Sequence, residues 1–386
     1  MTTFQKRLEN IHVSSIRLFD QEISSIPNIL KCTLGEPDFD TPEKIKQAGI
    51  QAISENFSHY TGMRGLPALC EAACAFQKEK YNLSYDAQTE VLTTVGVTEA
   101  ISATLLSILE EGDVVLIPTP AYPGYEPTIT LAGATLVGID TSETNFVLTK
   151  EQIETAFAKY GEKIKAIILN YPSNPTGKVL SRDEIKAIAE ALSEKEIFIV
   201  SDEVYSELIY EKEHTSIAEF LPEKTIVLNG LSKSHAMTGW RIGFIFARKT
   251  IIDEIIKVHQ YLVTAATTMS QKAGIVALTE CQEDVEKMRA EYLVRRNYLM
   301  KELSRLDVEY VSPDGAFYLF CKIPDIYSEN SWEFGKRLAN EAKLAIIPGI
   351  SFGESGDRYF RISYASSMDV LEQFIAQFGE FLRKAR

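Results

Sequence analysis

Short apolar runs rich in β-branched residues recur between residues 91 and 247, and most are separated by stretches with helical spacing. Seven runs fit strands: VLTTVG (91–96), VVLIPTP (114–120), ATLVGID (134–140), KAIILNYP (165–172), IFIVSDEVY (197–205), TIVLNG (225–230) and IGFIFA (242–247). Apolar strands that alternate with helices predict an α/β fold, with a mainly parallel sheet covered on both faces. The segment from Gly230 to Arg241 is hardly long enough for a crossover helix, so the seventh run is predicted to be antiparallel.

The pattern changes after Arg248, where long helical stretches appear at residues 249–278 and 285–306. A short mixed segment and an amphipathic C-terminal stretch follow them, which is typical of a smaller α+β domain. The expected organisation places an N-terminal arm packing on the small domain at residues 1–40. A large ligand-binding domain at 41–280 and a small C-terminal domain at 281–386 complete it.

Charge and composition exclude several classes of partner. The chain has a formal net charge of −14, which repels phosphate backbones and anionic lipid, so neither nucleic acid nor membrane is expected as a partner. The five cysteines form no CxxC pair and suit reduced thiols in a cytoplasmic protein. The histidines show no metal-ligand spacing, so no metal site is expected.

Polar residues follow several predicted strands, at the edge where open parallel sheets bind ligands. After the first strand, Gly96 and Thr98 begin a helix whose free N–H groups and positive end favour a phosphate. After the fourth, NYPSNPTGK places Asn170 and Asn174 at the strand end. Taken singly, each of these turns could equally be a plain connection.

Three charged residues extend this pattern. Asp202 ends the fifth run, where a carboxylate could cap a helix or hold a proton on a heterocyclic nitrogen. Lys233 follows the sixth run, and lysine is the amine whose pKa falls readily on desolvation, as attack on a carbonyl requires. Arg241 offers a bidentate fork for phosphate. A phosphate cradle, a pyridine-nitrogen partner and a Schiff-base lysine are the set that pyridoxal 5'-phosphate (PLP) requires.

These motifs resemble those of the class I, fold type I PLP-dependent aminotransferases, in the branch of bacterial aspartate and aromatic aminotransferases. The resemblance covers nearly the whole chain, through LGEPDFDTP, SHYTGMRGLPAL, AYPGY, YPSNPTG, SDEVYSEL, GLSKSHAMTGWRIGF, GAFYLF, IIPGISFG and RISYASSM. Within the branch, the chain resembles the aromatic amino acid aminotransferases of lactic acid bacteria. The resemblance implies a seven-stranded large domain, a smaller α+β domain and a homodimer with shared active sites.

The resemblance also implies roles for individual residues. Lys233, Asp202 and Tyr205 would be catalytic, with Lys233 forming the Schiff base. The cofactor would further be held by Asn174, Tyr122, Val97, Thr98, Ser232 and Arg241, and by Tyr60 from a second subunit. The substrate would be held by Arg361, Asn174 and Gly35, with Ile16, Phe19 and Phe352 as candidates for the side-chain pocket.

Two departures from the family pattern bear on specificity. Gly230 stands where many relatives have a serine, and Thr98 stands where members acting on acidic substrates carry a lysine. The expected reaction therefore moves the amino group of an aromatic L-amino acid to a 2-oxo acid, 2-oxoglutarate, by a ping-pong mechanism. The alternatives are an aspartate or N-acetyl-diaminopimelate aminotransferase, a PLP-dependent carbon–sulfur lyase, and a PLP-binding regulator. The regulator ranks last, because only about thirty residues precede LGEPDF.

Overall fold

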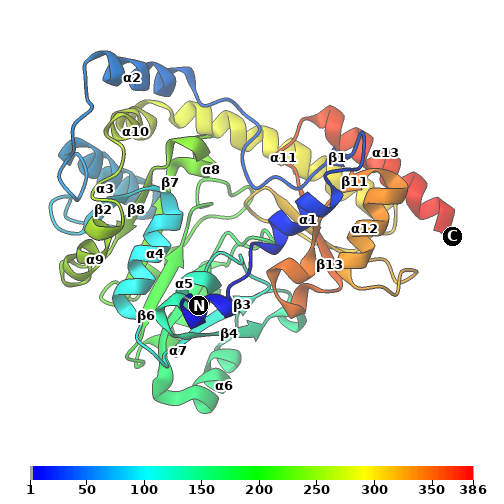
Figure 1. Ribbon diagram of the computed structural model, residues 1–386, viewed down its shortest axis with the longest axis horizontal. Helices are drawn as coiled ribbons and strands as arrows, with labels where there is room; N and C mark the ends of the chain where they lie inside the picture. Colours follow the sequence, from blue (N-terminus) through cyan, green and yellow to red (C-terminus); the bar gives the residue numbers. More distant parts are fainter. Residues whose placement is uncertain (1–2, 386) are drawn as a thin grey trace.

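The computed structural model describes residues 3–385, and its central feature is a seven-stranded sheet with the order β2-β8-β7-β6-β5-β3-β4 (Figure 1). The strands are β2 (Val91–Thr94), β3 (Val114–Thr119), β4 (Thr135–Asp140), β5 (Ile164–Asn170), β6 (Phe198–Asp202), β7 (Thr225–Gly230) and β8 (Gly243–Phe246). β8 pairs antiparallel with β2 and β7, and the other neighbours are parallel. The predicted α/β fold with one antiparallel strand is confirmed.

Helices cover both faces of this sheet. They are α2 (Glu43–Ser54), α3 (Pro67–Tyr81), α4 (Gly96–Ile108), α5 (Glu126–Ala132), α6 (Lys150–Tyr160), α7 (Arg182–Leu192), α8 (Leu231–Ser234), α9 (Lys249–Leu262) and α10 (Thr268–Glu280). Alternate strand residues point to opposite faces. Val115 and Leu228 belong to a buried cluster with residues of α4, α5 and α9. Leu116 clusters with residues of α6 and α7, and Val227 with residues of α3 and α10. This two-sided burial explains why the strands are apolar along their whole length.

The helical stretch that the sequence predicts over residues 249–278 is divided in the structure. α9 ends at Leu262 and α10 begins at Thr268. Thr264 lies between them in the left-handed conformation, with φ of +66°. A right-handed helix cannot continue through such a residue, so the chain turns there and α10 packs against α2 and α3.

The C-terminal part forms a smaller α+β unit. Its antiparallel sheet has the order β12-β13-β10-β9. The strands are β9 (Tyr310–Val311), β10 (Tyr318–Lys322), β12 (Ile347–Pro348) and β13 (Tyr359–Ser363), and the helices are α11 (Gln282–Arg305), α12 (Ser331–Ala342) and α13 (Met368–Ala385). Phe334, Phe360 and Phe374 are buried between them.

The N-terminal arm lies against this smaller unit, as Figure 1 shows for α1 (Ser15–Ile23). β1 (Leu30–Lys31) pairs in parallel with β11 (Leu344–Ala345). Phe19 and Ile23 of α1 join a buried cluster with Ala339 and Ala345. The arm is thus attached through its apolar face. The domain boundaries after residues 40 and 280 stay predictions.

Within residues 3–385, no helix is both long enough and apolar enough to cross a bilayer. All five cysteines are buried and free.

Candidate active site

A cleft of about 450 Å³ lies where the arm, the large unit and the small unit meet. Asn170 ends β5, Asp202 ends β6, and Lys233 follows β7 on α8, so the carboxyl ends of three neighbouring strands form its floor. Most of the residues predicted from the sequence line it: Ile16, Gly35, Val97, Thr98, Tyr122, Asn174, Asp202, Tyr205, Ser232, Lys233, Arg241 and Arg361. The structure therefore brings together side chains from distant segments.

Asp202 is held at the bottom of the cleft with only 4% of its surface exposed. Its Oδ2 accepts a hydrogen bond of 2.7 Å from the Tyr125 hydroxyl, and its Oδ1 accepts one of 3.3 Å from the Val204 N–H. Burial raises the pKa of Asp202 to about 6, although both hydrogen bonds act in the opposite direction. The carboxylate is therefore ionised at neutral pH and lies where a cationic partner would relieve the cost of its burial.

Lys233 is the amine of the cleft. Its Nζ donates a hydrogen bond to the Gly35 carbonyl oxygen. Burial lowers the pKa of Lys233 to about 8; Glu36 opposes this shift, while the positive charges of Arg361 and Arg241 add to it. A lysine with this pKa is far more often neutral near pH 7 than an ordinary one, so it can act as a nucleophile or base.

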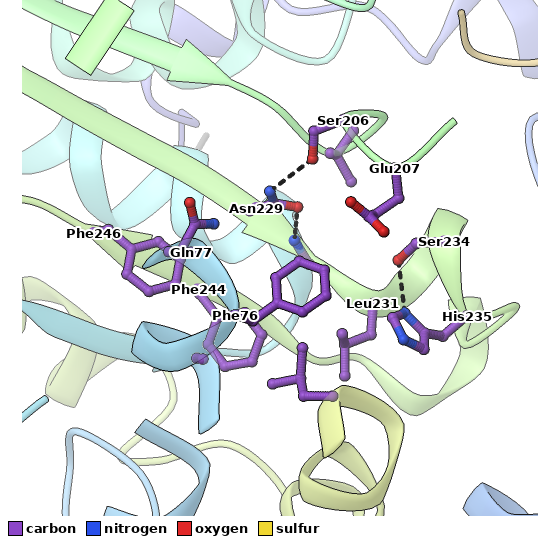
Figure 2. A pocket seen from close by; sticks show the side chains of 14 residues that line it. Phe76, Gln77, Ser206, Glu207, Asn229, Leu231, Ser234, His235, Phe244 and Phe246 are labelled. Atoms are coloured by element: carbon purple, nitrogen blue, oxygen red, sulfur yellow. Dashed lines mark hydrogen bonds between the residues drawn. The ribbon is translucent and has the colours of Figure 1, made fainter. Parts of the chain in front are cut away.

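The short helix α8, which carries the lysine, rests on a buried polar layer (Figure 2). Asn229 donates from Nδ2 to Ser206 Oγ at 3.0 Å, and its Oδ1 accepts the next backbone N–H at 2.7 Å. Ser234 Oγ and His235 Nδ1 lie 2.8 Å apart. Burial lowers the pKa of His235 to about 4, so its ring is neutral at pH 7. These contacts fix the end of β7 and the C-terminal end of α8.

A candidate anion-binding site lies at the N-terminus of α4. Gly96 begins α4 with φ of +73°, a conformation that favours glycine, and a Cβ there would lie 2.5 Å from Arg241 Nη2 and displace the guanidinium. The N–H groups of Val97 and Thr98, in the first turn of α4, have no acceptor within the helix. Ser232 lines the same cleft. The helix end and the guanidinium together favour a phosphate.

Arg361, on β13, reaches the cleft from the small unit. It is 2% exposed and donates from Nη1 to Asn174 Oδ1 and from Nη2 to the Thr33 carbonyl, both at 2.9 Å. The guanidinium carbon lies 4.2 Å from the centre of the Tyr318 ring. Its Nε has no hydrogen-bond partner among residues 3–385. A buried guanidinium with a free donor is suited to binding a carboxylate.

Aromatic side chains complete the walls. The Tyr122 ring lies 5.5 Å from the Tyr125 ring and nearly perpendicular to it. The Tyr205 and Tyr318 hydroxyls are 2.8 Å apart. Sequence reasoning did not select Tyr125 and Tyr318, although both lie in motifs it used, AYPGY and GAFYLF. It also did not select these lining residues: Ser14, Arg17, Thr33, Leu34, Glu36, Ile101, Val204 and Thr238.

Three predicted site residues do not line this cleft. Phe19 is fully buried between α1 and α12, 5.1 Å from the Trp332 ring, so it belongs to the core that attaches the arm. Phe352 is buried behind Arg361, with its ring centre 5.0 Å from the guanidinium carbon. Tyr60 is 86% exposed on the surface of the large unit. Phe19 and Phe352 therefore cannot contact a substrate in the cleft directly.

The cleft fits the cofactor that the resemblance implies. The N-terminus of α4, the Ser232 hydroxyl and Arg241 match a phosphate. The Asp202 carboxylate matches a protonated pyridine nitrogen, and the Lys233 amine matches an aldehyde carbon. A nucleotide or a metal ion would leave at least one of these groups without a role.

Comparison with known proteins bears on the same chemistry. A family model described as aminotransferase class I and II matches residues 27–378. The chain is 43% identical over 380 residues to a probable N-acetyl-LL-diaminopimelate aminotransferase of Bacillus subtilis, covering 98% of this chain and 96% of that protein. It is 38% identical to an aspartate aminotransferase of Pyrococcus abyssi, covering 98% of each.

A solved structure gives the same picture of the fold. The crystal structure of an aromatic aminotransferase from Pyrococcus horikoshii superimposes with a TM-score of 0.89 at 36% identity, covering 95% of this chain and 99% of that one. The similar proteins therefore share one type of reaction but carry three different substrate names.

Proposed function

The chain belongs to the class I and II aminotransferases, and we propose that within this family it transfers the amino group of an aromatic L-amino acid to 2-oxoglutarate. It is a PLP-dependent enzyme whose substrates are amino acids and 2-oxo acids. The observation that carries the aromatic assignment is the composition of the cleft walls. Tyr122, Ile16 and Ile101 line them, and position 98, where acidic-substrate members carry lysine, holds a threonine.

Residues at the buried end of the cleft hold the cofactor in this proposal. The N–H groups of Val97 and Thr98, with Ser232 and Arg241, would bind the phosphate, and Tyr122 would lie against the ring. Tyr205 and Asn174 would donate hydrogen bonds to the ring's phenolic oxygen. When bound, PLP supplies an electron sink for the charge that develops at the substrate Cα.

Two groups handle protons. Lys233 Nζ takes the proton from the substrate Cα, a task that its lowered pKa of about 8 suits because the amine must be neutral to accept it. Asp202 keeps a proton on the ring nitrogen, because an ionised buried carboxylate stabilises an adjacent cation. The Tyr125 hydroxyl supports this by hydrogen-bonding the ionised form.

Arg361 positions the substrate. Its free Nε and its flat guanidinium bind the α-carboxylate, with Asn174 and the backbone of Gly35 beside it. This anchor orients the Cα–H bond toward Lys233 and is common to every amino acid and 2-oxo acid. Donor choice therefore depends on the remainder of the cleft.

We propose that the active enzyme is a homodimer. Tyr60, Met63, Tyr261 and Leu262 are all exposed. They lie on neighbouring segments, because His259 of α9 contacts the Met63 carbonyl at 3.1 Å. An exposed aromatic surface of this kind suits a subunit interface, from which Tyr60 would reach the partner's phosphate site.

A second candidate donor is a substrate with a second carboxylate, such as N-acetyl-LL-diaminopimelate or aspartate. The relative at 43% identity and the position of Arg17 on the wall of the cleft favour it.

Product analysis tests these assignments. The holoenzyme should convert phenylalanine and 2-oxoglutarate into equal amounts of phenylpyruvate and glutamate, with no reaction when the acceptor is left out. Faster turnover of N-acetyl-LL-diaminopimelate than of phenylalanine would transfer the assignment to the second candidate. Continuous release of pyruvate and ammonia from cysteine-type substrates without an acceptor would instead identify a carbon–sulfur lyase.

A further inference from the structure

Arg17 is a cation of the cleft that has no role in the reaction of the aromatic donor proposed above. It lies on α1, next to Ile16, and both side chains line the cleft. Phe19 and Ile23 of the same helix are buried against the small unit, so α1 is fixed through one face and presents the other to the opening. Arg17 is exposed and has no hydrogen bond or ion pair with any residue between 3 and 385.

The charge of Arg17 acts on the interior of the cleft. Burial raises the pKa of Tyr122, and Asp202 adds to that shift, whereas the positive charges of Arg17, Arg241 and Arg361 oppose it. Arg17 therefore lies close enough to Tyr122 for its positive charge to lower the pKa of the hydroxyl, as the charges of Arg241 and Arg361 also do. The guanidiniums of Arg17, Arg241 and Arg361 thus line the same cleft as this ring.

The proposed reaction assigns a bound anion to some cations of the cleft and none to Arg17. Arg241 faces the phosphate, Arg361 the α-carboxylate, and Lys233 performs the proton transfer. Neither acidic residue of the cleft forms an ion pair with Arg17: Asp202 accepts a hydrogen bond from Tyr125, and Glu36 accepts one of 3.0 Å from Thr238. Among the residues that the structure describes, the guanidinium of Arg17 therefore has no anionic partner.

Two hydroxyls lie in the same part of the molecule as this charge. Ser14 is the N-cap residue of α1 but its side chain makes no capping hydrogen bond, and Thr98 is exposed in the first turn of α4. Both line the cleft, and neither hydroxyl has a hydrogen-bond partner within the described part of the chain. A guanidinium with neutral donors nearby is a suitable receptor for a carboxylate.

We propose that Arg17 binds the second carboxylate of dicarboxylic substrates, above all that of the 2-oxo dicarboxylic acid acceptor. The inference rests on the proposed function, because a ping-pong enzyme with an aromatic donor must hold an apolar ring and a carboxylate in turn in one cleft. Arg17 replaces, from the arm, the cation that position 98 lacks. With an aromatic donor bound, the exposed guanidinium stays hydrated.

Ligand binding to the holoenzyme tests this role without requiring turnover. Glutarate and pentanoate both have five carbons, but only glutarate has a second carboxylate. Arg17→Gln should weaken glutarate binding about tenfold or more and leave pentanoate binding within about twofold, by calorimetry. Arg17→Lys should recover part of the loss, because it restores the charge without the bidentate fork.

Lys6→Gln is the matched control, because Lys6 is an exposed cation of the arm that does not line the cleft. It should bind both ligands as the wild type does. An equal effect of Arg17→Gln on both ligands, no effect on glutarate, or a wild type that binds glutarate no better than pentanoate would each overturn the role of Arg17.

Kinetics separate this inference from the proposed function. Arg17→Gln should lower kcat/KM for 2-oxoglutarate about tenfold or more, while exchange between phenylalanine and 4-hydroxyphenylpyruvate stays within about twofold. If the wild type rejects aromatic donors, the aromatic assignment fails, and the glutarate measurement still decides the role of Arg17.

Discussion

The two ends of the cleft differ in how their side chains are held. At the inner end, Asp202, Ser232 and Arg361 are buried. Asp202 ends β6, Ser232 lies on α8 directly after β7, and Arg361 lies within β13. At the arm side, Arg17 and Thr98 are exposed and have no side-chain partners among the described residues. We therefore infer that the buried end holds the cofactor and carries out proton transfer, whereas the exposed end determines which substrate binds.

The buried end should be far more sensitive to substitution. Lys233→Ala removes the amine that is proposed to move the Cα proton, so turnover should fall by about 10³-fold or more in steady-state assays. Lys233→Arg should be equally inactive, because it keeps the positive charge but cannot lose its proton near neutral pH. Repeated turnover by either variant would show that another group acts as the base.

Arg361 should affect all substrates, in contrast to Arg17. Arg361→Gln removes the proposed α-carboxylate anchor and should lower kcat/KM by about 10²-fold for phenylalanine, glutamate and 2-oxoglutarate alike. The ratio between substrates is the informative quantity. If the loss were confined to dicarboxylates, the assignments of Arg361 and Arg17 would have to be exchanged.

Tyr125 tunes the buried end without being essential to it. Its hydroxyl donates a hydrogen bond of 2.7 Å to Asp202 Oδ2. Burial raises the pKa of Asp202 to about 6, and this hydrogen bond acts in the opposite direction. Tyr125→Phe should raise the pKa of Asp202 further, so that protonation sets in at higher pH. The acid limb of the kcat profile should move up by about one pH unit, with a severalfold loss of turnover at pH 7.

Tyr122→Phe is the control for the pH dependence of kcat, because Tyr122 makes no hydrogen bond to Asp202. It should leave the acid limb nearly in place. An unchanged acid limb in Tyr125→Phe would mean that Asp202 does not control it.

Phe19 should matter for stability alone. It is fully buried between α1 and α12 and does not line the cleft. Phe19→Leu should lower the free energy of unfolding by about 1 kcal/mol, measured by denaturant titration, and leave the ratio of aromatic to acidic donors within about twofold. A large change in that ratio would mean that the arm core also shapes the exposed end.

The same two ends differ in how well the sequence predicts them. Lys233, Asp202 and Arg241 follow apolar strands, and the carboxyl ends of parallel strands converge, so their proximity could be inferred from order along the chain. The motif resemblance, together with this rule, located nearly all of the inner end. Tyr125 was not selected because the choice between two tyrosines of AYPGY depends on which ring points toward Asp202.

The arm side was harder to predict because its residues have no strand rule to place them. Phe19 and Arg17 lie two residues apart on α1, and only the rotation of that helix decides which of them is buried. The periodicity of a nine-residue helix shows an apolar face, but it does not show what that face packs against. Tertiary packing with α12 settles the point: Phe19 is in the core and Arg17 is at the cleft.

The most direct test of the whole account is the half-reaction of the holoenzyme with single amino acids in the absence of an acceptor. The absorbance of the bound cofactor should change rapidly with phenylalanine or tyrosine and more slowly with aspartate, with one amino group transferred per active site. Rapid change with aspartate alone would contradict the aromatic assignment. The absence of any stoichiometric change, with pyruvate accumulating from cysteine-type substrates, would contradict the assignment as an aminotransferase.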